Sequence, residues 1–136
     1  MASNWIWVNS KRQIVLLDTS AIFMVFENTI DLEKELNRLL GSYEIFIIHN
    51  VIEEINILKE KGSGKQKKLS KVALQFIKRY KIIEGVKHKG VDESLIQIAL
   101  EKKALVLTND KELRKRLRNN NIQTIFLRGN NYLMMD

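Results

Sequence analysis

The sequence predicts a single α/β domain, a three-layer α/β/α sandwich around a parallel sheet of five strands. Two observations predict this fold class. Short apolar runs typical of buried strands alternate with longer segments in which apolar residues recur at helical spacing. The 136 residues are enough for one domain with a sizeable core and too few for two. We expect an arm at residues 1–12 and the domain at residues 13–136.

The first strand is expected at residues 14–17, whose apolar side chains are typical of a strand covered on both faces. This run ends on Asp18. The carboxylate can cap the helix expected after it, or it can belong to a ligand site, because ligands bind beyond the carboxyl ends of parallel strands. The arm before the strand contains Trp5 and Trp7, and it is compatible with an edge strand, a tag remnant or a partner-binding segment.

An amphipathic helix follows and is expected to end at Gly41, before a second strand at residues 44–48. Asn50 and Glu53 have the spacing of a capping box, which predicts that the next helix begins there. Residues 59–71 are rich in lysine and contain Gly62 and Gly64, so we expect a mobile basic loop. Such a loop either binds a polyanion or only keeps the protein soluble.

The alternation of helices and strands continues to the end of the chain. The remaining elements, in order, are a helix over residues 69–80, a strand at 82–83, a helix over 91–100, a strand at 104–107, a helix containing Leu113 and Leu117, and a strand at 122–127. Because a helix separates each strand from the next, we expect the strands to pair in parallel.

The composition limits the partners and the metals that the chain can bind. A formal charge of +7 and a pI near 9.7 favour a polyanion such as nucleic acid, although solubility alone is an alternative explanation. There is no cysteine, and His49 and His88 are isolated in the sequence, so any metal must be bound by oxygen. No apolar run of 18 residues and no secretory signal is present, so we expect a cytoplasmic protein without membrane association.

Four carboxylates fall at the junctions between strands and helices. Asp18 and Asp110 follow strands, whereas Glu54 and Asp92 lie near the starts of helices that follow strands. In a parallel sheet these junctions share one edge, so we expect the four side chains to converge in one cleft. Asp18 also has an ordinary explanation as a helix cap, and Glu54 has one as a partner of a helix dipole.

A cluster of this kind predicts a divalent cation. Two carboxylates a few ångströms apart repel each other by ~4 kcal/mol at an effective dielectric constant of about 20, so the cluster requires protonation or a cation. Ligands that are all oxygen favour Mg²⁺ or Mn²⁺ over Zn²⁺. A cation held in this way activates water and stabilises the leaving oxygen of a phosphodiester. The basic loop and the helix with Arg114 to Arg118 would then contact phosphates.

Four motifs in order, Leu-Leu-Asp18-Thr-Ser-Ala, Val-Ile-Glu-Glu54-Ile, Val-Asp92-Glu93-Ser-Leu-Ile-Gln-Ile-Ala and Leu-Thr-Asn-Asp110-Lys-Glu-Leu-Arg, resemble the PIN-domain family of metal-dependent ribonucleases. The resemblance extends over residues 13–128. It implies a PIN-like fold, a cleft of acids that binds one or two Mg²⁺ or Mn²⁺ ions, and endonucleolytic cleavage of RNA. By position, the family's acids correspond to Asp18, Glu54, Asp92 and Asp110.

The resemblance also implies roles for single residues. The four acids would be catalytic and would bind the metal, and Glu54 would orient the attacking water or hold a second ion. The reaction would leave a 3′-hydroxyl and a 5′-phosphate. The supporting residues would be Ser20, Thr108, Asn109 and, as a fifth acid, Glu93. The expected RNA-binding residues are Lys65, Lys67, Lys68, Lys71, Arg114 and Arg118.

Two biological roles are compatible with this resemblance. One is a VapC-type toxin, which an antitoxin protein blocks, and the other is a PIN endonuclease of rRNA processing. The basic insertion and the Asp92-Glu93 pair favour the second role. The family resemblance also favours a homodimer. The alternative is a catalytically inactive PIN scaffold that binds RNA during ribosome assembly. A phosphatase of the haloacid dehalogenase type is disfavoured, because Asp18 is not followed by a second Asp two residues later.

Overall fold

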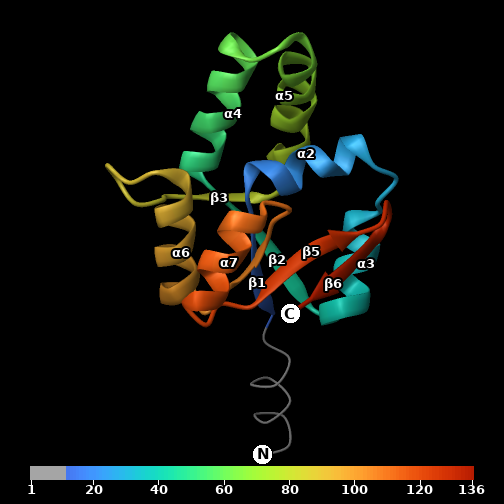
Figure 1. Ribbon diagram of the computed structural model, residues 1–136, viewed down its shortest axis with the longest axis vertical. Coiled ribbons are helices and arrows are strands. Elements are labelled where there is room, and N and C mark those ends of the chain that lie inside the picture. Colours follow the sequence, from blue (N-terminus) through green and yellow to red (C-terminus); the bar gives the residue numbers. More distant parts are fainter. Residues whose placement is uncertain (1–11) are drawn as a thin grey trace, which may run out of the picture.

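The computed structural model describes residues 12–136, in which one six-stranded sheet forms the centre (Figure 1). The strand order is β3-β2-β1-β4-β5-β6. Five strands are parallel, and the last pairs antiparallel with β5. The strands are β1 (Gln13–Leu17), β2 (Tyr43–Ile48), β3 (Lys81–Ile83), β4 (Leu105–Leu107), β5 (Thr124–Arg128) and β6 (Tyr132–Met135). The predicted fold class is confirmed, and the sequence analysis missed β6. Trp5 and Trp7 lie outside the described residues.

Strand β1 lies at the point in the sheet where the order of strand addition reverses. Val15 of β1 pairs with Ile45 of β2 on one side and with Leu105 of β4 on the other. The chain therefore builds the sheet from β1 towards β3, and then returns across β1 to add β4 and β5. In α/β sheets, the crevice beyond the strand ends at such a switch point is the usual ligand position.

Helices cover both faces of the sheet. Helices α6 and α7 lie on one side and α3 on the other, whereas α4 and α5 extend beyond the carboxyl ends of the strands (Figure 1). This division follows from right-handed crossovers, because the direction in which strands are added reverses after β3. The helices are α2 (Thr19–Glu27), α3 (Leu32–Leu40), α4 (His49–Lys61), α5 (Gly64–Phe76), α6 (Val91–Lys102) and α7 (Lys111–Asn119), with a short 3-10 turn at Ile77–Arg79.

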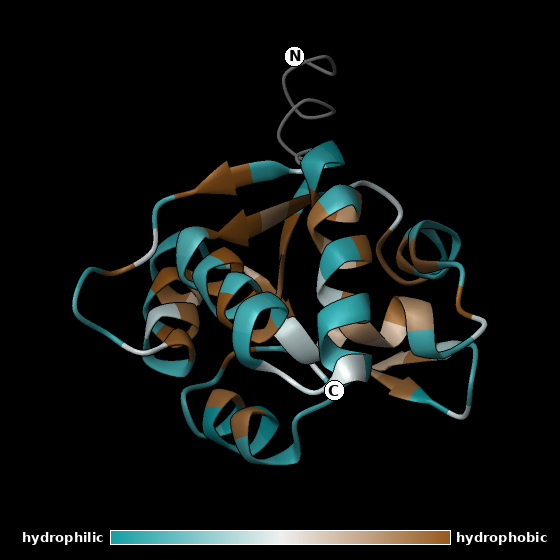
Figure 2. Ribbon diagram, turned by 90° about the horizontal axis from the view of Figure 1, so that it is seen from above, coloured by the Kyte–Doolittle hydropathy of each residue, from teal (hydrophilic) through white to brown (hydrophobic). Residues whose placement is uncertain are grey.

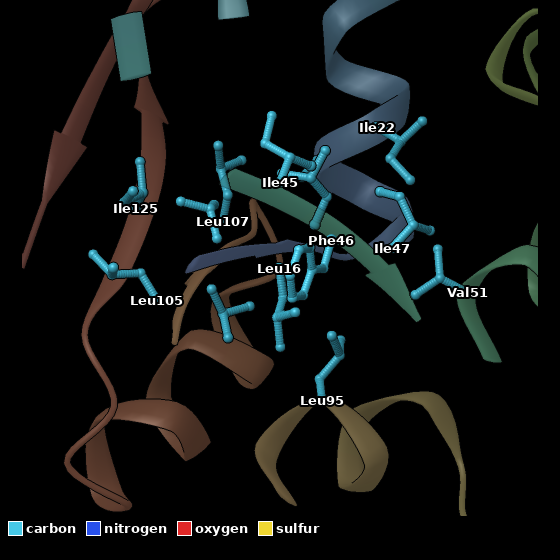
Figure 3. Packing of buried hydrophobic residues seen from close by; sticks show 14 of the residues in the cluster. Leu16, Ile22, Ile45, Phe46, Ile47, Val51, Leu95, Leu105, Leu107 and Ile125 are labelled. Atoms are coloured by element: carbon cyan, nitrogen blue, oxygen red, sulfur yellow. The ribbon is translucent and has the colours of Figure 1, made fainter. Parts of the chain in front are cut away.

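The core lies between the sheet and these helices. Figure 2 shows mostly hydrophobic strands between helices whose outward turns are hydrophilic. Leu16 is fully buried at the centre, and Leu95 of α6 and Ile22 of α2 approach the strands from opposite sides (Figure 3). Each fully buried Leu or Ile side chain contributes about 1.5–3 kcal/mol relative to an exposed one. This packing fixes the positions of the helix starts relative to the strand ends.

The segment 59–71 is helical, which corrects the prediction of a mobile basic loop. Only Gly62 and Ser63 interrupt two antiparallel helices, α4 and α5. The Ser63 hydroxyl accepts a hydrogen bond from the Gln66 amide, and the Gln66 side chain accepts one from the Ser63 amide, so the two residues form a capping box. A Cβ on Gly62 would lie 2.5 Å from the Leu58 carbonyl oxygen, so the turn requires glycine. Lysine and glutamine then favour continuation of the helix.

Strand β6 closes one edge of the sheet through side chains of α3. Gly129, with a φ of 68°, forms part of the tight connection from β5 to β6. The Leu133 amide donates to the Glu35 carboxylate at 2.9 Å, and the Leu133 carbonyl accepts from Arg38 at 2.7 Å. Side chains thus occupy backbone groups that a neighbouring strand would otherwise bind. Within the described residues, no helix is long and apolar enough to span a membrane.

Candidate active site

The four predicted acids all lie at the carboxyl edge of the sheet. Asp18 and Asp110 are the N-cap residues of α2 and α7, which begin directly beyond β1 and β4. Glu54 lies near the start of α4, and Asp92 lies in the first turn of α6. The starts of all four helices lie at the same edge of the sheet, below the hairpin of α4 and α5 in Figure 1. The sheet topology therefore brings these distant segments to one edge.

Asp18 is the most buried of these acids, with 5% of its surface exposed. Its carboxylate accepts hydrogen bonds from the Ala21 amide at 2.8 Å, from the Ser20 hydroxyl at 2.8 Å and from the Thr108 hydroxyl at 2.5 Å. Asp18 caps α2, so its predicted role as a helix cap is confirmed. Burial, with a smaller contribution from the charge of nearby Asp110, raises the pKa of Asp18 to about 6 against the opposing effect of the three hydrogen bonds.

Two hydroxyl groups join the β1 junction to the β4 junction. The Ser20 hydroxyl also accepts from the Asn109 amide at 3.0 Å, and the Thr108 hydroxyl accepts from the Asp110 amide at 3.0 Å. Ser20 and Thr108 thus hold Asp18 and the start of α7 together. The Asn109 side chain accepts from the Leu127 amide at 3.0 Å, so this predicted supporting residue fastens the junction to β5.

Thr19 connects Asp18 to Glu54. The Thr19 hydroxyl, buried at the start of α2, donates a hydrogen bond to the Glu54 carboxylate on α4. The neighbouring Glu53 instead pairs with His49 at 2.9 Å on an exposed part of α4, which agrees with the preference for Glu54 in the sequence analysis. Thr19 was not predicted as a site residue, although it is a hydroxyl residue directly after Asp18.

The Asp92 carboxylate lies near other acids and near the guanidinium of Arg116. Partial burial raises its pKa, and the charge of Asp110 raises it further. Arg116 on α7 has the opposite effect, with a guanidinium nitrogen 3.7 Å from the Asp92 carboxylate and another 3.0 Å from Glu93. Glu93 and Glu54 add smaller effects that raise the Asp92 pKa. The sequence analysis did not identify Arg116, because spacing along the chain does not show which arginine of α7 faces α6.

The start of α6 is fixed by Asn50, which does not form the predicted capping box. Helix α4 begins at His49 without a side-chain cap. The side-chain nitrogen of Asn50 donates to the backbone carbonyls of Val86 and Lys89. Its side-chain oxygen accepts from the Ser94 hydroxyl at 3.2 Å. The expected local bond is replaced by these contacts, which connect α4, the carrier of Glu54, to the first turn of α6, the carrier of Asp92.

The acids do not form a closed metal site as they are arranged. Within residues 12–136, no three Asp, Glu or His side chains lie close enough together to hold one ion. Their chemistry fits a hard divalent cation, because every donor is oxygen and because Asp18 and Asp92 have raised pKa values to which neighbouring acids contribute. Asp110 uses one oxygen to cap α7, at 2.9 Å from the Glu112 amide. Side-chain rotation is needed for three of the acids to share an ion.

The predicted RNA-binding residues fall in two separate places. The four lysines are exposed on α5, and Lys65 pairs with Glu27 at 3.2 Å. Arg114 and Arg118 instead face Asp136, with Arg114 at 2.8 Å and stacked over Phe126. Asp136 also exchanges backbone hydrogen bonds with the first residue of β5, at the amino end of that strand. The side chains of the two arginines are therefore paired with Asp136, and neither forms an ion pair with the four predicted acids.

The fold and the site define an α/β domain with several acids at the carboxyl edge of its sheet. The chain belongs to the PIN-like domain family, whose model matches residues 15–130. It is 34% identical to Ribonuclease VapC4 of Methanocaldococcus jannaschii, covering 87% of this chain and 92% of that protein. It is 28% identical to Ribonuclease VapC9 of Archaeoglobus fulgidus, covering 88% and 87%.

Solved structures agree with this assignment. The structure of the PIN domain endonuclease Utp24 superposes with a TM-score of 0.74 at 26% identity, covering 90% of each chain. A domain of a functionally unknown protein from Methanocaldococcus jannaschii superposes with a TM-score of 0.65 at 16% identity, covering 86% of this chain and 92% of that one. The second likeness concerns the fold alone.

Proposed function

We propose that this protein is a Mg²⁺- or Mn²⁺-dependent endoribonuclease of the VapC type. The observation that carries the proposal is the hydrogen-bonded connection of three junctions, in which Thr108 binds Asp18 and Thr19 binds Glu54. Acids from distant segments are thereby held at one edge. The names of the two ribonuclease relatives support RNA as the substrate.

Each acid has a role in this proposal. A divalent cation, when bound, supplies the activation of a water molecule and the neutralisation of charge on the phosphate. Asp18, Asp92 and Asp110 hold the cation, and Ser20 and Thr108 orient Asp18 through hydroxyls that can rotate. Glu54 is oriented by Thr19 and positions the attacking water or a second ion. The expected products are a 3′-hydroxyl and a 5′-phosphate.

The exposed lysines of α5 supply the contact to the RNA backbone. Lys68 and Lys71, three residues apart, share the side of α5 opposite its buried residues Ser70 and Ala73, and Lys65 and Lys67 flank that side. Helices α4 and α5 project from the same edge as the acids (Figure 1). RNA that lies across this edge can therefore contact α5 and reach the acids. In a VapC-type system, an antitoxin protein would block this surface, and the chain would act as a homodimer.

The decisive experiment is cleavage of end-labelled RNA by the purified protein. We expect cleavage with Mn²⁺ or Mg²⁺, none with EDTA, and none by the Asp18→Asn variant with either ion. Cleavage that persists in EDTA or in Asp18→Asn would contradict the proposal. Binding of RNA without any cleavage by the wild-type protein would instead support the inactive scaffold.

A second measurement separates the two biological roles. The basic segment 59–71 and the Asp92-Glu93 pair favour a role in rRNA processing, whereas the VapC names of the relatives support a toxin. If the protein is a toxin, its expression arrests growth and the Asp18→Asn variant does not. If it processes rRNA, depletion in its own host causes accumulation of uncut precursor rRNA.

A further inference from the structure

Among the residues that the structure describes, Arg116 is the one cation in contact with the four predicted acids. Within residues 12–136, no other Lys, Arg or His nitrogen lies within 4.0 Å of Asp18, Glu54, Asp92 or Asp110. The Arg116 side chain is 43% exposed and lies on α7 next to Leu117, which is fully buried. The backbone at Arg116 is therefore fixed by the core, whereas its guanidinium can move in solvent.

The two carboxylates that bind Arg116 hold it unequally. Glu93 is 3.0 Å from one guanidinium nitrogen and forms a hydrogen bond, whereas Asp92 is 3.7 Å from another. The remaining Glu93 oxygen lies back over the start of α6, where a Cβ on Gly90 would approach it to 2.9 Å. The contact with Asp92 is the looser of the two, so it is the one that breaks when Asp92 acquires another partner.

We infer that Arg116 is an internal counter-cation that binds Asp92 in the metal-free protein and is displaced from it, while still held by Glu93, when a divalent cation binds. This inference rests on the proposed function. Glu93 was predicted to be a fifth acid of the metal site. In this inference it instead holds Arg116 and so affects the metal site only indirectly. A positive charge beside Asp92 also opposes the approach of a second positive charge, so Arg116 lowers the affinity for the metal.

The test is a titration of EDTA-stripped protein with Mn²⁺, measured by isothermal calorimetry at low ionic strength and without RNA. We expect Arg116→Gln to bind Mn²⁺ more tightly than the wild type, with a Kd on the order of tenfold lower. The control is Lys115→Gln, which removes the same charge from the neighbouring exposed position and should change the Kd by no more than about twofold. We also expect Arg116→Gln to show a lower Tm in EDTA and a larger rise in Tm on addition of Mn²⁺.

A double-mutant cycle tests the role of Glu93. If Glu93 acts through Arg116, Glu93→Gln weakens Mn²⁺ binding in the wild-type background and has no effect in the Arg116→Gln background. Weakening by the same factor in both backgrounds would show that Glu93 is itself a ligand and would contradict its assigned role.

Three results would overturn the inference or its basis. An unchanged or weaker Mn²⁺ affinity of Arg116→Gln, with normal affinity of the wild type, overturns the counter-cation alone. An equal effect of Lys115→Gln shows that only net charge matters and also overturns it. Absence of Mn²⁺ binding by the wild-type protein overturns the metal dependence in the proposed function and the inference together.

Discussion

Asp18 accepts three hydrogen bonds and is still hard to ionise, because only 5% of its surface is exposed to water and another acid lies near. The raised pKa, about 6 against a usual 3.8, means that ionisation of Asp18 costs folding free energy. The folded protein binds the proton more tightly than the unfolded chain. Stability of the metal-free protein therefore falls as the pH rises from about 4 through 6, and the cost at neutral pH is about 3 kcal/mol.

The Asp18→Asn substitution should remove this cost. At pH 7.5 in EDTA, we expect the variant to have a free energy of unfolding about 1–3 kcal/mol higher than the wild type, since an amide cannot ionise and still accepts from the Ala21 amide. Below pH 4 the difference should disappear, because the carboxyl is then protonated in both states. Urea unfolding across this pH range measures it. A variant less stable than the wild type at pH 7.5 would show that the hydrogen bonds outweigh the burial.

At this scale the sequence could predict that the four acids lie at one edge of the sheet, but not which side chains they contact. Asp18 and Asp110 were identifiable because they follow apolar strands, Asp18 directly and Asp110 after two polar residues, and the residues beyond a strand end lie at the edge of the sheet. Thr19 and Arg116 were missed because their roles depend on side-chain direction across elements, from α2 to α4 and from α7 to α6. The same limit explains Asn50, whose local capping partner was visible while its distant partner Ser94 was not.

The helical hairpin of α4 and α5 shows that whole elements, too, can depend on contacts that the sequence does not reveal. Glycine and a dense run of lysines are typical of exposed loops, and repulsion between neighbouring lysines disfavours a helix. The capping box of Ser63 and Gln66 and the burial of Ala73 outweigh that repulsion. The capping box was present in the sequence, but the burial that makes it effective requires the tertiary structure.

Replacement of three lysines on this hairpin should weaken RNA binding. We expect the Lys65→Gln, Lys67→Gln, Lys68→Gln triple variant to bind single-stranded RNA more weakly, with a salt slope shallower by about 0.7 for each phosphate that is no longer neutralised. Glutamine preserves the helix, so circular dichroism should be unchanged. Fluorescence anisotropy at several salt concentrations provides the measurement.

The matched control for this variant carries Lys78→Gln, Lys102→Gln and Lys103→Gln. These three lysines are also exposed, and they lie just before β3 and β4, at the amino ends of the strands. The control loses the same charge at the opposite end of the sheet from the acids. Equal weakening in both variants would mean that net charge, and not the hairpin, attracts RNA.

Across the whole molecule, the parallel sheet was predictable because its pattern repeats along the chain. Strand β6 was not predicted, since its four residues lie beyond the last helix and their place depends on contacts with α3. The Gly129-Asn130-Asn131 connection was a hairpin signal in the sequence. The pairing with Glu35 and Arg38, nearly one hundred residues earlier, has no signature in the spacing.

Removal of the Glu35 carboxylate should loosen this edge. We expect Glu35→Ala to lower the Tm, because the Leu133 amide then loses its partner, and Glu33→Ala on the same helix to have a smaller effect. Hydrogen bonds from Arg38 and from the Leu133 amide hold the Glu35 pKa below its usual value. Ionised Glu35 therefore stabilises the folded protein at any pH above its usual pKa. This contribution is lost as the pH falls through the lowered pKa of the folded protein. Thermal unfolding should show a larger difference at pH 7 than at pH 3, where protonation of Glu35 has weakened its bonds to Arg38 and to the Leu133 amide.

The occupied backbone of Leu133 also limits how copies of this molecule can join. At one border of the sheet, Glu35 and Arg38 take the positions that an incoming chain would need, whereas β3 at the other border has an exposed Ile82 and no strand beside it among residues 12–136. Growth into a fibril by main-chain pairing needs two open borders on every copy. A sheet with one open border can join a second copy edge to edge and then has no further place to extend.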